Sequence, residues 1–157
     1  MSSGSFSIEV WARAADKDQR GPARIVSISK DTGSRNVTLG QEGTQLVLRL
    51  RTSATNDQGQ PELMAPEGTL DPERFQHIVA TYDGIATVLY VDGQRVAESE
   101  SSAGSLEKWD KEMPLIIGNE ATGDRPWRGQ IRLVAIHVLP LSDAEVTAAF
   151  AAGPPGK

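Results

Sequence analysis

Apolar and polar residues alternate in short runs along most of the chain. In residues 6–11, Phe6, Ile8 and Val10 take every second position, with polar residues or Trp11 between them. Because successive side chains of a β-strand point to opposite faces, this period of two predicts a strand. The same pattern predicts further strands in residues 25–29, 36–40, 45–51, 76–82, 87–91, 115–117 and 131–139.

Tight turns separate several of these runs. Asp83-Gly84 and Asp92-Gly93 each lie between β-branched stretches, and glycine accepts the positive φ that short turns require. Many short strands with almost no helical periodicity are typical of an antiparallel sandwich. The sequence therefore predicts an all-β fold built from two antiparallel sheets.

One helix is expected, in residues 142–152 near the end of the chain. Ser142 and Glu145 have the spacing of a capping box, and an alanine-rich run follows. The sequence Gly153-Pro154 ends the helix. Val146 and Phe150 are four residues apart, so we expect them to share a face that packs along an edge of the sandwich.

Two long stretches lack strand periodicity and are predicted to be loops. Residues 52–72 are polar and contain three prolines, and residues 98–114 begin with a serine-rich segment. Long loops of a compact domain frequently carry function, so we expect ligand-binding residues there.

Length and charge exclude several classes of protein. The chain has 157 residues, a length that suits one domain, and its 16 Lys and Arg against 21 Asp and Glu give a net charge of −5. This balance argues against a nucleic-acid partner, which requires clustered cations. There is no cysteine, no apolar run long enough to span a bilayer and no signal peptide at the start of the sequence.

Several motifs resemble those of one family. Residues 75–84 with residues 89–93 are similar to the central hairpin of laminin-G-like domains, and residues 6–11 and 127–131 resemble their opening and closing segments. This resemblance identifies the chain as a laminin-G-like domain of type 3 (LamG), with the jelly-roll fold of concanavalin A-like lectins and glucanases. Residues 36–43 and 48–52 also resemble the subgroup attached to VanZ-type bacterial membrane proteins.

The resemblance implies a function and a location. Such domains are mostly non-catalytic modules that bind carbohydrate or protein at the cell surface, so we expect a glycan or protein partner and an extracytoplasmic, bacterial setting. We expect the domain in residues 6–152, a leader or tag-like segment in residues 1–5 and a linker in residues 153–157 of a larger parent protein. The alternative is a scaffolding domain of a membrane-associated protein with no small ligand, the domain itself not crossing the membrane.

Calcium is a frequent cofactor of the family. The family often has an acidic pair after its Gly-x-Ile segment, whereas this chain has Arg132 there. A guanidinium at that place repels a cation, so we predict no cofactor and no strong calcium site. If a calcium ion does bind, Asp83, Asp92 and Asp124 are the candidate ligands.

Catalysis is not expected. A retaining glycosidase requires two carboxyl groups about 5 Å apart. The nearest candidates are Asp110 with Glu112 and Glu98 with Glu100, and both pairs fall in the serine-rich loop rather than in an apolar strand. His77 and its neighbours lack the spacing of a zinc site, and we expect this ring to bond to a neighbouring strand. A degenerate glycoside hydrolase is the remaining alternative.

A candidate binding surface comes from residues 45–51. Leu46, Leu48 and Leu50 share one face of this strand, which leaves the arginines on the other, and guanidinium groups match carboxylates or phosphates. We expect Trp11 and Trp127 to be core residues. The predicted recognition surface consists of Arg49, Arg51, Asn56, Asp57 and Trp109, and the alternative is an ordinary solvated strand face.

Overall fold

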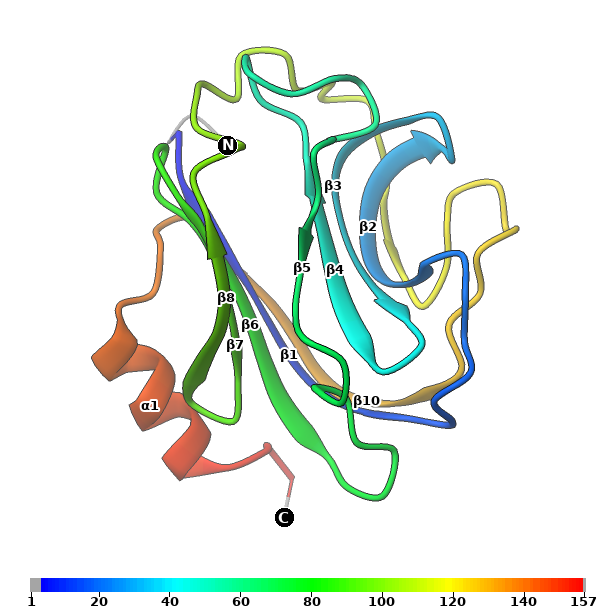
Figure 1. The fold of residues 1–157 in the computed structure, drawn as a ribbon, viewed down its shortest axis with the longest axis vertical. Helices are drawn as coiled ribbons and strands as arrows, with labels where there is room; N and C mark the ends of the chain where they lie inside the picture. The colour runs from blue at the N-terminus through cyan, green and yellow to red at the C-terminus, as the bar shows by residue number, and fades with distance from the viewer. Residues whose placement is uncertain (1–3, 157) are drawn as a thin grey trace.

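The structure is a computed structural model that describes residues 4–156. Residues 1–3 of the expected leader and residue 157 of the expected linker lie outside the described residues. Figure 1 shows the strands and the helix: β1 (Phe6–Ala14), β2 (Ala23–Asp31), β3 (Ser34–Glu42), β4 (Gln45–Leu50), β5 (Leu63–Met64), β6 (Gln76–Tyr82), β7 (Thr87–Val91), β8 (Gln94–Ser99), β9 (Leu115–Ile117), β10 (Gly129–His137) and α1 (Asp143–Ala152). No helix in residues 4–156 has the length and hydropathy needed to cross a membrane.

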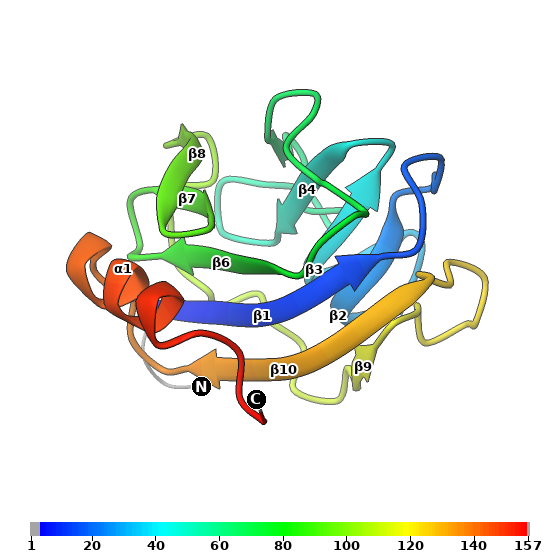
Figure 2. The same cartoon turned by 90° about the horizontal axis from the view of Figure 1, so that it is seen from below.

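The strands form two five-stranded antiparallel sheets. Sheet A has the order β10-β1-β6-β7-β8, and sheet B has the order β5-β4-β3-β2-β9. Many neighbouring strands come from distant parts of the chain, since β1 pairs with both β6 and β10. The sheets face each other, with α1 on the far side of sheet A (Figures 1 and 2). The predicted jelly-roll sandwich with a short C-terminal helix is confirmed.

Two strands lie where the sequence pattern predicted none. β8 pairs with β7 and extends into the stretch predicted to be a loop over residues 98–114. β5 pairs with β4 inside the predicted loop of residues 52–72. β8 is an edge strand without a buried residue, and β5 has two residues, so neither shows an apolar alternation.

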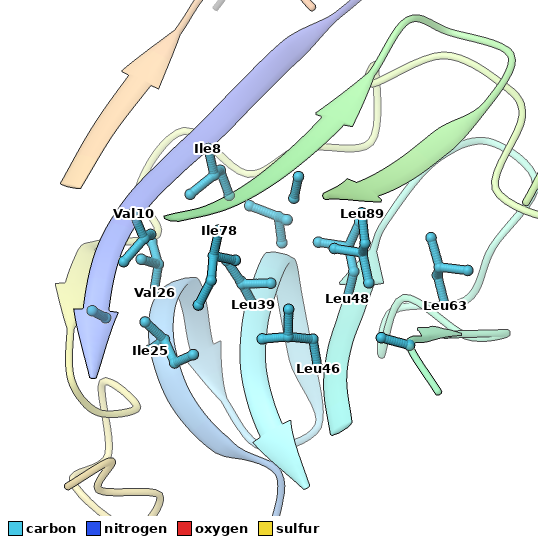
Figure 3. Packing of buried hydrophobic residues seen from close by; sticks show 14 of the residues in the cluster. Ile8, Val10, Ile25, Val26, Leu39, Leu46, Leu48, Leu63, Ile78 and Leu89 are labelled. Atoms are coloured by element: carbon cyan, nitrogen blue, oxygen red, sulfur yellow. The ribbon is translucent and has the colours of Figure 1, made fainter. Parts of the chain in front are cut away.

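The core lies between the inner faces of the two sheets. Across β1 and β6, Ile8 lies opposite Ala80 and Val10 lies opposite Ile78. The side chains that meet in the core come from both sheets, including the short β5 of sheet B (Figure 3): Ile8, Val10, Ile25, Val26, Leu39, Leu46, Leu48, Leu63, Ile78 and Leu89. The predicted inward face of β4 is confirmed, because its leucines are buried in this cluster.

Trp127 closes one end of the core, as expected. Its ring is buried in the core cluster, and its indole N–H donates to Gln41 Oε1 at 2.8 Å. A Cβ atom on Gly129 would collide with the Trp127 ring and with the carbonyl oxygen of Arg13. The glycine of this motif is therefore required by the close approach of the tryptophan to β1.

The helix α1 begins with the predicted capping box. Ser142 Oγ accepts the Glu145 backbone N–H at 3.3 Å, and Glu145 Oε2 accepts the Ser142 backbone N–H at 2.8 Å. These two bonds satisfy backbone donors that a helix start otherwise leaves free. Gly153, at φ 76°, ends the helix.

The predicted position of α1 along an edge of the sandwich is wrong. Val146 is fully buried against Val79, Val88 and Tyr90, which point outward from β6 and β7 in the middle of sheet A. The helix therefore covers the outer face of this sheet. The sequence showed which helix residues are apolar but not which surface of the sandwich receives them.

Trp11 is buried, but in a different place from the one expected. It lies on the outer face of sheet A, outside the cluster between the sheets. Its ring stacks on Phe150 of α1, with centroids 6.0 Å apart and an interplanar angle of 17°, and lies 4.9 Å from the His77 ring. The helix, rather than the second sheet, shields this tryptophan from water.

A carboxylate between two histidines joins three strands beside this contact. Glu9 on β1 bonds to His77 Nε2 on β6 at 2.9 Å and to His137 Nε2 on β10 at 2.8 Å. The expectation that His77 bonds to a neighbouring strand is confirmed. Burial opposes ionisation of Glu9, but the hydrogen bonds from the two rings outweigh it and hold the pKa of this carboxyl below its ordinary value.

We predict that Glu9→Gln destabilises the domain and flattens its acid denaturation. A carboxyl whose folded pKa is lowered stabilises the fold above its unfolded pKa of about 4.3, and this stability is lost as pH falls through the folded pKa. Near pH 7 the variant should lose about 1–3 kcal/mol, because one buried imidazole loses its acceptor. Urea denaturation from about pH 3 to about pH 7, a range that covers the titration of the Glu9 carboxyl, measures the free energy of unfolding.

Glu67→Gln is the matched control, since Glu67 is an exposed carboxylate in the loop before β6. It should behave like the unmodified chain over the whole pH range. An equal acid slope for Glu9→Gln and the unmodified chain contradicts the assigned role of Glu9.

Candidate ligand-binding face

The outer face of sheet B carries polar side chains where sheet A carries a helix. Strand pairing places Ser27, Thr38 and Arg49 in one row across β2, β3 and β4, and pairs Ser29 with Arg35. We call the following side chains the arginine face: Arg24, Ser27, Ser29, Arg35, Thr38 and Arg49. All except Arg49 are buried, which is unusual for charged residues on the outer side of a sheet.

Arg24 is held by a buried ion pair. Its Nε lies 3.2 Å from Glu120 Oε2, both side chains are at most 2% exposed, and Nη1 donates to the Pro22 carbonyl oxygen at 2.6 Å. Ser29 donates to the second oxygen of Glu120. Burial lowers the pKa of Arg24, and the bond to Glu120 opposes this shift. The connection between β9 and β10 thus supplies a buried carboxylate to Arg24.

Arg35 is only partly hydrogen-bonded. Its Nη2 donates to the Thr32 carbonyl oxygen within the turn between β2 and β3. Nε and Nη1 are buried and have no hydrogen-bond partner, although the residue is 0% exposed. Burial, followed by the nearby charges of Arg24 and Arg49, lowers the pKa of Arg35 to about 10, so it remains a cation at neutral pH.

The predicted residues Arg49 and Arg51 point away from the core. Arg49 Nη2 lies 3.5 Å from Glu62 Oε1, and Arg51 Nη2 lies 2.8 Å from Asp57 Oδ1. Their side chains are 16% and 18% exposed, so these guanidinium groups reach solvent at the border of the arginine face. The Nε atom of each has no partner.

Asn56 and Asp57 lie in one turn beside these arginines. Asn56 Oδ1 accepts the backbone N–H groups of Gln58 and Gln60, which fixes the shape of the turn. The Asp57 carbonyl oxygen accepts the Arg35 backbone N–H at 3.0 Å. The turn thus links the end of β4 to the start of β3.

Trp109 is connected to the same region from the other side of the sheet. Its indole N–H donates to the Arg51 carbonyl oxygen at 2.8 Å, but its ring packs against Phe6, with centroids 5.4 Å apart. The ring also lines a cavity of about 680 Å³ together with Ile28 and Met113. Four of the predicted residues therefore gather at the border of the arginine face, whereas the tryptophan ring lies on the core side.

The residues considered for calcium each have a local partner. Asp83 accepts the backbone N–H groups of Ile85 and Ala86, Asp92 pairs with Arg74 at 2.5 Å, and the exposed Asp124 accepts the Thr122 hydroxyl. Within residues 4–156, no group of three acidic, histidine or cysteine side chains is arranged to hold a metal ion. The guanidinium carbon of Arg132 lies 4.1 Å above the Phe75 ring.

The carboxylate pairs considered for catalysis also serve local structure. Asp110 Oδ1 accepts the Glu112 backbone N–H at 2.9 Å, which closes a turn. Glu98 forms an ion pair with Arg95 at 2.9 Å on the exposed side of β8. Asp110 and Glu98 thus bond to residues that are two or three positions away in the sequence.

Sequence reasoning missed Arg24, Arg35 and Glu120. Ser27 and Ser29 alternate with the apolar residues of β2, but Arg24 lies three residues before Ser27, and only the register shift after Arg24 brings it to the same face. Nothing in the sequence indicated Glu120, because it reaches Arg24 from 96 residues further along the chain.

Comparisons with known proteins agree on the fold. The model of a family described as Laminin_G_3, concanavalin A-like lectin/glucanases superfamily, matches residues 1–147. No curated protein matches the chain. Among solved structures, the Ruminococcus gnavus IT-sialidase CBM40 bound to alpha2,3 sialyllactose superposes with a TM-score of 0.76 and 14% identity, over 94% of this chain and 83% of that chain.

Two toxin domains are also similar. The binding domain of botulinum neurotoxin serotype C1 has a TM-score of 0.63 and 16% identity, over 95% of this chain and 36% of that chain. The binding domain of botulinum neurotoxin DC in complex with rat synaptotagmin II has a TM-score of 0.63 and 17% identity, with the same coverage of 95% and 36%. At these low identities the similarity shows a shared fold and nothing further.

We predict that Glu120→Gln destabilises the domain by about 3–5 kcal/mol, because it leaves the buried Arg24 without its counter-charge. Glu98→Gln, which breaks an ion pair whose side chains are 47% and 51% exposed, is the control and should cost less than about 1 kcal/mol. Chemical denaturation measures both variants. Equal losses would mean that the Arg24–Glu120 pair has no special structural role.

We also predict that EDTA changes the melting temperature by no more than about 1 °C, because we expect no strong calcium site. A calcium ion present at 100 Kd would stabilise the fold by about 2.7 kcal/mol, so its removal would lower the melting temperature visibly. Differential scanning calorimetry with and without added calcium measures this. A fall of many degrees that calcium reverses contradicts the prediction.

Proposed function

From the premise that this chain belongs to the Laminin_G_3 family of the concanavalin A-like lectin/glucanases superfamily, we propose that it is a non-catalytic module that binds carbohydrate. The family match covers residues 1–147, and similar folds include a carbohydrate-binding module and toxin binding domains. In this proposal the domain spans residues 6–152 and acts at the cell surface as part of a larger protein.

The observation that carries the proposal is the partly exposed pair Arg49 and Arg51. Both guanidinium groups lie on a sheet face that the core does not use, and each keeps an Nε–H without a partner. Sugars present fixed patterns of hydroxyl and carboxyl oxygens, which planar donors of this kind recognise. We therefore propose that the ligand binds over Arg49, Arg51, Asn56 and Asp57.

Trp109 has a supporting place in this proposal. Its bond to the Arg51 carbonyl oxygen holds the end of β4, and its ring packs on Phe6 instead of facing the arginines. We propose that it positions Arg51 rather than stacking on a sugar. The narrower relationship to domains of VanZ-type proteins stays a prediction.

We predict that Arg49→Ala and Arg51→Ala each weaken glycan binding by about 1 kcal/mol or more and change stability by less than about 0.5 kcal/mol. A glycan array identifies ligands, calorimetric titration measures the affinities, and an assay for released reducing ends should detect no turnover. Arg95→Ala, an exposed arginine on sheet A, is the matched control and should bind as the unmodified chain does.

Four results would overturn the proposal. Glycan binding unaffected by both substitutions would exclude this surface, and unfolding of both variants would make the arginines structural. Absence of glycan binding together with capture of a defined protein partner would favour the scaffolding alternative. Turnover of a bound glycan would make the domain an enzyme.

A further inference from the structure

Three of the six side chains of the arginine face are cations and none is an anion. Arg24 and Arg49 lie close enough to Arg35 to lower its pKa, and Arg49 also lowers the pKa of Arg24. The carboxylates around the face are the buried Glu120, which bonds to Arg24 and Ser29, the partly exposed Glu62, which lies 3.5 Å from Arg49, and Asp31, whose charge acts on Arg35. Buried charges of one sign repel strongly unless a counter-charge accompanies them.

The free hydrogen-bonding groups here are all donors. Nε and Nη1 of Arg35 and Nε of Arg49 are buried without partners. A water molecule brings donors as well as acceptors and no charge, so it matches three cationic donors poorly. A carboxylate has acceptors only, carries a negative charge and binds guanidinium groups through paired bonds.

We propose that this face binds a sugar that carries a carboxylate, and that the carboxylate bonds to Arg35 and Arg49. The inference rests on the proposed function and adds the class of ligand to it. The carboxylate enters beside Arg49, which is 16% exposed, whereas Arg35 is 0% exposed. It takes the place of Glu62, whose 3.5 Å contact with Arg49 is long for a charge-assisted hydrogen bond.

The free atoms of the fully buried Arg35 determine how the sugar is oriented on the face. Its Nη2 is already bonded to the turn between β2 and β3, so the free Nε and Nη1 are the groups left for a ligand. The neutral part of the sugar then lies toward Arg51 and Asp57, where the surface is open. The proposal thus joins the recognition surface to the buried cations beside it.

The test compares three classes of small molecule at constant ionic strength and neutral pH. The first is carboxylated monosaccharides (glucuronate, galacturonate and N-acetylneuraminate), the second their neutral counterparts (glucose and galactose), and the third acetate with inorganic sulfate. Heteronuclear NMR of the arginine Nε–H groups reports contact directly. We expect at least one acidic sugar to shift the Arg35 and Arg49 signals and to bind at least about tenfold more tightly than glucose or acetate.

Substitutions at Arg49 and at Glu62 should change acidic-sugar affinity in opposite directions. Arg49→Ala should weaken acidic-sugar binding by at least about tenfold, and Arg49→Lys should restore part of it, because it keeps the charge without the planar donors. Glu62→Gln should strengthen binding by about two- to fivefold, since it removes a competing carboxylate. Glu67→Gln, which changes an exposed carboxylate on the other side of β5, is the control and should leave binding unchanged.

Each other outcome overturns the inference. Equal binding of acetate and glucuronate would make this a site for free oxoanions, and equal binding of glucose and glucuronate would remove the role of the carboxylate. No shift of the Arg35 and Arg49 signals with any acidic sugar would also refute it. Failure of the proposed function looks different, since it is the loss of all glycan binding on the array, neutral glycans included.

Discussion

Side chains along an antiparallel strand point alternately to two faces, and in a sandwich one face of each sheet is committed to the core. In this chain Leu46, Leu48 and Leu50 enter the core from β4, so Arg49 has to lie outside. The same rule sends Ile8 and Val10 of β1 inward and Glu9 outward. The Glu9 cluster and the arginine face both follow from this alternation, because the core face between the sheets is apolar.

The outer faces of the two sheets are covered and paired in different ways. On sheet A, α1 places Val146 on the apolar residues of β6 and β7 and Phe150 on Trp11, and Glu9 joins the strands through His77 and His137. That face is packed under the helix, and its charged group Glu9 is paired with both rings, although His77 Nδ1 has no hydrogen-bond partner. Sheet B has no helix, and the turn after β9 brings Glu120 to one arginine only.

Burial without full pairing distinguishes the arginine face from an ordinary solvated surface. A guanidinium group that is removed from water loses hydration, and this loss is offset only by acceptors placed at its N–H groups. Arg24 has such acceptors in Glu120 and Pro22, whereas Arg35 has one for Nη2 alone. An incompletely paired buried cation of this kind is a feature expected where a ligand completes the set of acceptors.

The sequence by itself determined the strand pattern, the capping box of α1 and the outward direction of Arg49 and Arg51, because these depend on local periodicity and on residues that are close along the chain. Only the tertiary structure decided that α1 covers the face of sheet A, that Trp109 turns toward Phe6, and that Glu120 meets Arg24. These contacts join segments up to about a hundred residues apart, and local propensity carries no information about which distant surfaces meet.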